Sequence, residues 1–244
     1  MTELAPSLQA RPVLGSADAV RAFYLFEASL MTVIVLAGFW PFYAGLVAGG
    51  TVRHPVIYLH AAVFTGWLVL MISQVLLVYV RKVRIHQRVG RAAIGYAIAL
   101  LVLGIAVSII LTVERVTAGE STVDAAAGFL VLPLGDLLLF GGLFAAGIHY
   151  RRAPATHKRL MLLATNALVF PGAARLGDPS IAMIFGLWFL PIVLAMAFDQ
   201  FTTGRIHRVY YIGVAVMLVF FMRVGLIDAE LWLAIGRRIV GAFL

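Results

Sequence analysis

Long apolar runs separated by short polar segments are the main pattern along this chain. A helix needs about 20 apolar residues to cross a bilayer. Seven runs approach or exceed that length, at 23–48, 55–80, 92–113, 128–148, 160–176, 180–200 and 209–227. The fifth run is the shortest, and Pro171-Gly172 interrupts it. The pattern predicts an all-α, polytopic membrane domain of seven transmembrane helices over 23–227, preceded by a cytoplasmic segment of residues 1–22.

The segment 228–244 follows the last run and differs from it in character. Trp232 and several aliphatic residues lie there beside Arg237 and Arg238. A short segment of mixed apolar and basic composition is typical of an amphipathic helix lying in the membrane interface. We therefore expect a short C-terminal interfacial helix, with a continuation of the seventh span as the alternative.

Composition narrows the class of protein. Of the 244 residues, 63% are hydrophobic and 12% are charged, whereas a soluble domain averages about 25% charged residues. A soluble core of this length cannot bury so much apolar surface. The composition therefore excludes a soluble enzyme, a disordered chain and a nucleic-acid-binding module, and it predicts the lipid bilayer as the main partner. The chain has no cysteine, which excludes disulfides, thiolate ligands and iron–sulfur clusters.

Basic residues concentrate before the first run and after the second, fourth and sixth runs. Thirteen of the 19 lysines and arginines lie there: Arg11, Arg21, Arg81, Lys82, Arg84, Arg88, Arg91, Arg151, Arg152, Lys158, Arg159, Arg205 and Arg208. Five lie on the other side: Arg53, Arg115, Arg175, Arg237 and Arg238. Because cytoplasmic loops are enriched in Lys and Arg, the sequence predicts a bacterial inner-membrane protein with its N-terminus inside and its C-terminus outside. The first 22 residues lack the pattern of a signal peptide, so we expect no cleaved leader.

Four of the six histidines lie on the predicted cytoplasmic side. His86, His157 and His207 each precede an odd-numbered span, and His149 ends the fourth span at the same depth. A helix N-terminus favours the neutral imidazole, which is the form that binds metals. These four are candidate ligands of a b-type haem, and His86, His157 and His207 are candidate ligands of a transition metal ion. The alternative is that they anchor the helices at the interface, cap them or pair with Asp199.

A second polar set lies in the outer half of the predicted bundle. It comprises His60, Asp136, Arg175 and Arg223. Ionisable residues inside a membrane are costly and by default mark functional sites, so these four are candidate lining residues of a cavity for a quinol, an anionic headgroup or a small polar substrate. The alternative is a buried ion pair of Asp136 with Arg175 or Arg223, because an unpaired buried charge is strongly unfavourable.

Further polar residues lie within the apolar runs. His60, Trp67 and Gln74 recur every seven residues and therefore share one face of a helix. The inner half also contains Glu27, Asn166 and Asp199, for which a functional and a structural role are both open.

Several activities lack their sequence signatures. The two lysines, Lys82 and Lys158, fall in predicted loops, so the chain cannot form a retinal Schiff base inside its last helix. The sequence contains no HExxH zinc motif, no GxSxG nucleophile motif and no phosphate-binding glycine loop followed by lysine.

Five short segments carry a resemblance to known proteins. They are His54–His60, Arg84–Gly90 with its HxxxG motif, the PLGD motif of Pro133–Asp136, the HKRLM motif of His157–Met161 and the GRxH motif of Gly204–His207. Over residues 20–240 the chain resembles a widespread family of uncharacterised bacterial seven-helix integral membrane proteins. HKRLM is also similar to a segment of membrane proteins that mature haem-copper oxidases, and HxxxG is similar to turns in transmembrane b-type cytochromes. These last two resemblances imply haem handling through His86 and His157, with His149 or His207.

Three functions remain open from the sequence. The first is a haem- or metal-binding protein in redox or electron-transfer chemistry with a quinol or another small substrate. The second is a non-catalytic subunit or assembly factor of a larger membrane complex. The third is a carrier or receptor for a small anionic or lipidic ligand that binds Arg175 and Arg223.

Overall fold

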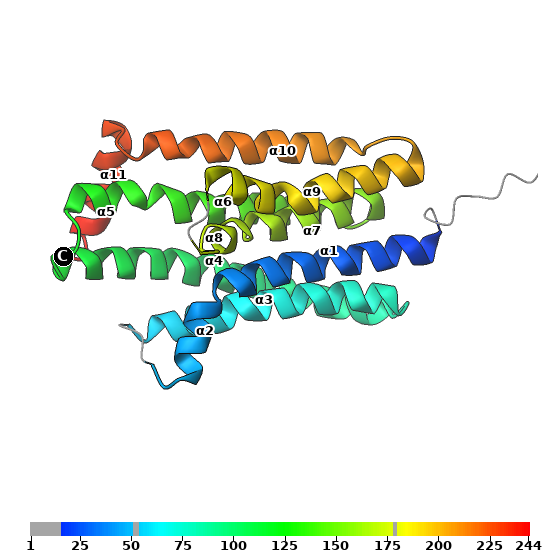
Figure 1. Ribbon diagram of the computed structural model, residues 1–244, viewed down its shortest axis with the longest axis horizontal. Helices are drawn as coiled ribbons and strands as arrows, with labels where there is room; N and C mark the ends of the chain where they lie inside the picture. Colours follow the sequence, from blue (N-terminus) through cyan, green and yellow to red (C-terminus); the bar gives the residue numbers. More distant parts are fainter. Residues whose placement is uncertain (1–15, 51–53, 178–179) are drawn as a thin grey trace, which may run out of the picture.

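The computed structural model describes residues 16–50, 54–177 and 180–244, and every regular element in these ranges is a helix (Figure 1). Arg11, Arg53 and most of the predicted segment 1–22 lie outside the described residues. The predicted all-α class is confirmed for the part of the chain that the structure describes.

Within the described ranges, six helical segments are long and apolar enough to cross a membrane. Four are single helices: α1 (Ala17–Gly38), α3 (Val56–Tyr79), α4 (Val83–Thr117) and α9 (Ile181–Thr203). Two are composite: α5 (Val123–Phe129) with α6 (Val131–His149), and α10 (Arg208–Phe221) with the 3-10 turn η2 (Met222–Leu226). The chain is therefore a multi-pass helical membrane protein.

Four shorter helices complete the fold. They are α2 (Trp40–Val47), α7 (Pro154–Ala167), α8 (Phe170–Ala173) and α11 (Glu230–Gly241). The fifth apolar run, 160–176, falls on α7 and α8. With 14 residues, α7 is shorter than the ~20 that span a bilayer, and Pro171 provides no backbone N–H at the start of α8. The structure thus has six long spans, and a seventh crossing remains a prediction.

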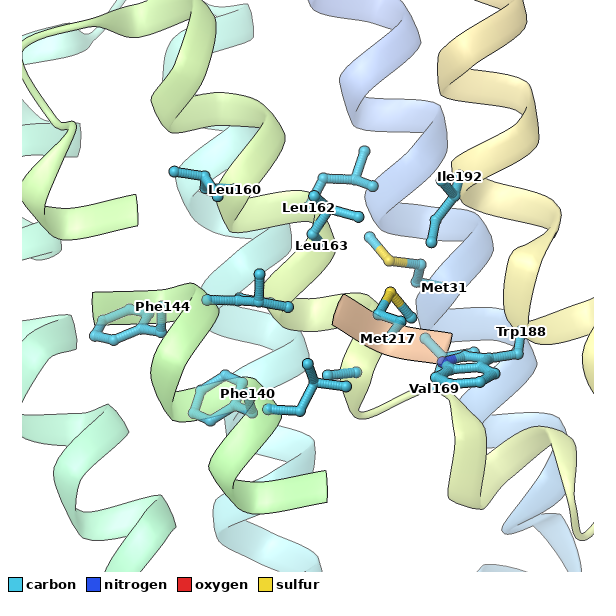
Figure 2. Close-up of a cluster of buried hydrophobic side chains, with 14 of the residues drawn as sticks. Met31, Phe140, Phe144, Leu160, Leu162, Leu163, Val169, Trp188, Ile192 and Met217 are labelled. Atoms are coloured by element: carbon cyan, nitrogen blue, oxygen red, sulfur yellow. The ribbon is translucent and has the colours of Figure 1, made fainter. Parts of the chain in front are cut away.

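The centre of the bundle is built around α7. Every residue from Leu162 to Ala167 is buried, as expected for a helix enclosed on all sides. Figure 2 shows Met31 of α1 between Leu162 and Leu163 of α7 and Ile192 of α9, with Met217 of α10 next to it. These fully buried side chains come from α1, α7, α9 and α10, and their contacts pack α1, α9 and α10 around α7.

Two glycines allow α1 and α8 to touch backbone to backbone. A Cβ atom added at Gly38 would collide with the carbonyl group of Gly172, and one added at Gly172 would lie 2.7 Å from Cα of Val35. Small residues at such crossings are a common packing device between membrane helices. The contact holds the interrupted α7–α8 segment against α1.

The predicted cytoplasmic segments lie at one end of the bundle. The start of α1 and the α3–α4, α6–α7 and α9–α10 turns all lie at the right of Figure 1. We call this the basic end, defined by residues 16–21, 80–91, 150–159 and 204–208. The α4–α5 turn and α11 lie at the other end, which we call the distal end.

The C-terminal helix α11 packs on α5 at the distal end. Trp232 Nε1 lies 3.0 Å from the carbonyl oxygen of Ala127, to which it donates, and Arg237 Nε donates to Asp124 Oδ1 at 2.6 Å. On the other face, Leu231 is 80% exposed. The segment 228–244 thus contains the helix α11, and the interfacial helix expected there remains a prediction.

Candidate histidine site

The structure brings together two of the four predicted haem-ligand histidines. His86 lies in the first turn of α4 and His157 lies four residues into α7, and both are half-buried near the basic end. Their ring centroids are 6.4 Å apart, with an angle of 72° between the ring planes. Two imidazoles from helices far apart in the sequence thus form a close pair.

One nitrogen of His157 is fixed by a hydrogen bond to the backbone. Its Nδ1 lies 2.8 Å from the carbonyl oxygen of Gly147 in α6. A carbonyl oxygen only accepts, so Nδ1 carries the proton and the Nε2 lone pair is left free. Histidines that bind metals usually donate their other ring N–H to a carbonyl or carboxylate in this way. Gly147 also lets α6 and α7 pack closely, since a Cβ there would lie 2.9 Å from Sδ of Met161.

Unpartnered polar atoms lie beside His86. The ring is next to Gln74 of α3, and Nδ1 of His86 and both amide atoms of Gln74 are buried without a hydrogen-bond partner. Gly90, the last residue of the HxxxG motif, lies beside this amide, and a Cβ there would make an ordinary contact with Gln74 Oε1 at 3.5 Å. A buried polar group left unpaired costs about 1–3 kcal/mol. The donor set therefore suits a bound polar or metal-containing group.

The two other histidines lie apart from this pair. His149 is exposed, and its ring packs against Tyr150 with 4.9 Å between centroids. His207 is the N-cap of α10: its Nδ1 accepts from the Val209 N–H at 3.3 Å, and its own N–H donates to Asp199 Oδ2 at 3.1 Å. Burial lowers the pKa of His207, and the Arg159 guanidinium adds to the shift. The capping role and the contact with Asp199, named as an alternative above, describe His207 in the structure.

The predicted three-histidine metal set is not assembled. Among the described residues, no group of three or more His, Cys, Asp or Glu side chains could hold one metal ion. His86 and His157 supply two imidazoles, which is the number of axial ligands that a bis-histidine haem uses. A transition metal ion at the pair would need a further ligand, and the amide oxygen of Gln74 is an unpartnered candidate. The pair therefore supplies two of the ligands that the expected cofactors would use, and the full predicted set is not assembled among the described residues.

The HKRLM motif also contributes a buried ion pair that the sequence did not reveal. Arg159 Nε donates to Asp199 Oδ2 at 2.9 Å, and Nη2 donates to Oδ1. Arg159 is 6% exposed and Asp199 is 3% exposed. Arg159 Nη1 also donates to the carbonyl oxygen of Ala155 at 2.6 Å. One motif thus turns His157 toward α4 and Arg159 toward α9, two positions apart on the helix.

The outer set of four divides into two groups. In the first, the buried Arg223 forms an ion pair with Asp136 and donates from Nε and Nη2 to the carbonyl oxygen of Leu132 at 3.3 and 3.1 Å. Gly135 makes room for the guanidinium, since a Cβ there would collide with the Arg223 side chain. The PLGD motif therefore accommodates and neutralises Arg223, which is the ion-pair alternative considered for this set.

The second group contains Arg175 and His60. Arg175 is exposed at the α8–α9 connection, donates to the carbonyl oxygen of Pro171 at 2.7 Å and lies 4.8 Å above the Phe39 ring. His60 packs on Phe64 with 4.1 Å between centroids and lies within electrostatic reach of Arg175. The contacts of these two residues are thus separate from those of Asp136 and Arg223.

The polar face of α3 runs from His60, in the outer set, to Gln74, beside the histidine pair. His60 Nδ1, Trp67 Nε1 and the Gln74 amide are all buried without a hydrogen-bond partner. The Trp67 ring packs edge-on against Phe140 and Phe144 of α6, with centroids 5.0 and 5.5 Å apart. The seven-residue repeat therefore places unpartnered polar atoms along one line through the bundle.

Comparisons of the chain with protein-family models, curated proteins and solved structures found no match. The fold and the site define the class on their own, namely a multi-pass helical membrane protein with two buried arginine–aspartate pairs and a histidine pair near its basic end. The resemblance to bacterial seven-helix membrane proteins remains a prediction from the motifs.

Proposed function

We propose that this protein binds a haem b or a transition metal ion through His86 and His157 and takes part in redox or electron-transfer chemistry with a quinol or another small substrate. The pairing of the two rings at 6.4 Å supports the proposal most strongly. His149 and His207 are at the same end of the bundle and make other contacts, so they are outside the proposed ligand set.

Each residue of the site has a specific role in this proposal. Gly147 holds the His157 ring in the tautomer that leaves Nε2 free. His86 offers the unpartnered Nδ1, and the Gln74 amide offers both a donor and an acceptor to a bound group. When bound, a haem or a transition metal ion supplies one-electron chemistry, and the protein tunes it through axial ligands and the polarity of the surroundings.

The proposal includes a membrane placement. α9 runs back to the basic end (Figure 1), and in this proposal α7 and α8 together carry the chain away from that end as a seventh crossing. The basic end faces the cytoplasm of a bacterial inner membrane, because its loops contain most of the lysines and arginines. α11 then lies at the outer interface with Leu231 toward lipid or toward another subunit.

An absorption spectrum with metal analysis tests the cofactor directly. Protein purified in mild detergent should show a Soret band or contain close to one transition metal ion per chain. A colourless preparation with no stoichiometric metal, even after supply of haem and metal salts during expression, would refute the proposal.

Arg175 supports a second candidate function, a carrier or receptor for an anionic or lipidic ligand. Arg223 is neutralised by Asp136, whereas the exposed Arg175 guanidinium contacts the Phe39 ring and a backbone carbonyl. A panel of quinones and anionic lipids should then raise the melting temperature of the wild type and leave the Arg175→Ala variant unchanged. Equal shifts in both proteins would exclude a site at Arg175.

A further inference from the structure

Glu27 of α1 is a fully buried carboxyl group. It is 0% exposed, and neither carboxylate oxygen has a hydrogen-bond partner. The described residues contain two other buried carboxyl groups, those of Asp136 and Asp199, and each is bound to an arginine. Glu27 therefore differs from both in having no counter-charge bound to it.

The surroundings of Glu27 are largely apolar. Met31 lies one helical turn further along the same face of α1, and Figure 2 places Met31 among side chains of α7 and α9. Glu27 thus enters the same interhelical space one turn closer to the basic end. An ionised carboxylate without a partner is strongly unfavourable in such a place. The neutral acid, with a proton on one oxygen, is the form that fits.

The titratable groups of the neighbouring helices leave Glu27 without a cation. α9 contributes Asp199 and α7 contributes Arg159, and these two bind each other. α8 has no titratable residue, and Tyr43 of α2 is bonded to Thr65. The remaining titratable residues on α3 and α7 are Tyr58, His60, Tyr79, His157 and Lys158. The Lys158 ammonium lies 4.5 Å from the centre of the Tyr24 ring. On α1 itself, Asp18 and Arg21 form an ion pair with each other near the start of the helix.

Two tyrosines connect Glu27 with the basic end. Tyr24 lies three residues before Glu27 on α1 and interacts with it electrostatically. The Tyr24 and Tyr210 hydroxyl oxygens are 3.3 Å apart. The Arg159 guanidinium lies 5.7 Å from the Tyr210 ring, and its partner Asp199 accepts from the backbone of His207 at the basic end. Polar groups of Tyr24, Tyr210, Arg159 and Asp199 therefore lie between Glu27 and the basic end, without a hydrogen bond to Glu27 itself.

We propose that Glu27 is a proton-binding site, loaded and emptied from the basic end through the hydroxyl groups of Tyr24 and Tyr210. On release, Tyr24 moves within hydrogen-bonding distance of Glu27 and takes the proton of the acid on its oxygen, Tyr24 passes its own proton to Tyr210, and Tyr210 passes its own to a water molecule that enters from the basic end. Loading is the reverse. Each hydroxyl ends with one proton, so the net step moves one proton between Glu27 and water. The proposal does not depend on a cofactor at His86 and His157.

Infrared spectroscopy of the purified protein tests the site. The wild type at neutral pH should show the C=O stretch of a protonated carboxylic acid. Glu27→Gln should remove this band and Asp136→Asn, at an arginine-paired position, should leave it. A band that persists in Glu27→Gln would overturn the proposal. So would its loss from the wild type on adding sodium or potassium ions, because a metal cation would then occupy the site.

Chemical labelling gives a test that needs no variant. A hydrophobic carbodiimide reacts with protonated carboxyl groups inside membranes, so peptide mass spectrometry of the treated wild type should find the adduct on Glu27. Labelling at Asp136 or Asp199, with Glu27 unmodified, would contradict the proposal.

The route is tested by hydrogen–deuterium exchange of the same infrared band. In D2O, Tyr210→Phe should slow the isotope shift by about tenfold, because a relay hydroxyl is missing. Tyr211→Phe removes a hydroxyl from the next residue, whose side chain is 55% exposed, and is the matched control. Equal exchange rates in the two variants would overturn the route.

Discussion

At the scale of single residues, the direction of a side chain decides which polar groups form a site. His149 and Gly147 are two residues apart on α6, about 200° around the helix. Gly147 faces His157, so His149 faces outward and is exposed. The sequence indicated the depth of the histidines and could not indicate their direction, because the order of helices around the bundle is a tertiary property. His86 and His157 therefore could not be distinguished in advance from His149 and His207.

The buried ion pair between Asp136 and Arg223 makes a quantitative prediction. Asp136→Asn leaves the Arg223 guanidinium buried with no counter-charge, which typically costs about 3–5 kcal/mol. The matched control is Asp124→Asn, which breaks the exposed pair with Arg237 and should cost much less, because solvent screens exposed ion pairs. Thermal unfolding in detergent measures both. Similar losses in the two variants would show that Arg223 is solvated or has another partner.

His207 predicts a pH dependence of stability. Its pKa is lowered in the folded protein, so below its ordinary value of about 6.5 the unfolded chain binds a proton that the folded chain resists. The contribution of the neutral His207 to stability is then fully present above that pH, and it is lost as the pH falls towards the lowered pKa. His207→Asn keeps a good N-cap and should flatten the dependence of melting temperature on pH between about 7 and 5. His149→Asn, at an exposed position, is the control. An unchanged pH profile in His207→Asn would contradict the assignment.

At the scale of helices, apolar pattern and observed structure agree where a helix faces lipid and differ where it is enclosed. The run 92–113 predicted only the apolar part of α4, which begins earlier, at Val83. The apolar pattern missed the first turns because they carry arginines on the exposed face. α7 begins at Pro154, before its apolar run, since Pro is favoured in the first turn of a helix. Hydrophobicity located the fifth run at 160–176 and missed the first turn of α7, which contains His157, and the break between α7 and α8.

The α1–α8 crossing predicts a strong position effect among glycines. Gly38→Ala places a Cβ against the Gly172 carbonyl group, so we expect it to destabilise the protein by about 1–3 kcal/mol. Gly45→Ala, in α2 with nothing within 4 Å of the added Cβ, should be neutral or slightly stabilising. Thermal unfolding of both variants gives the comparison. Equal effects would mean that the two helices do not touch at Gly38.

At the scale of the whole molecule, the described parts of the segments predicted as cytoplasmic lie at one end of the bundle, as alternating crossings require (Figure 1). The absence of cysteine makes the orientation directly testable with single introduced cysteines. Ser121→Cys at the distal end should react with a membrane-impermeant maleimide in cells whose outer membrane has been permeabilised. Arg152→Cys at the basic end should react only after the inner membrane is disrupted. The reverse pattern would invert the orientation.

The same labelling tests the seventh crossing. Ser180→Cys, just before α9, should react from the outside like Ser121→Cys if α7 and α8 together cross the membrane. Reaction only from the inside would mean that α7 and α8 enter the membrane and return on the same side.

The central claim, a cofactor held by His86 and His157, is tested most directly by cofactor content in three single variants. Haem and metal stoichiometry should be retained in His149→Ala, which removes a histidine at the same end of the bundle and outside the pair. The bound cofactor should be lost in His86→Ala and in His157→Ala, each compared with the wild type at matched folding by circular dichroism. Equal cofactor content in all three variants and the wild type, or its absence from the wild type, would contradict the claim.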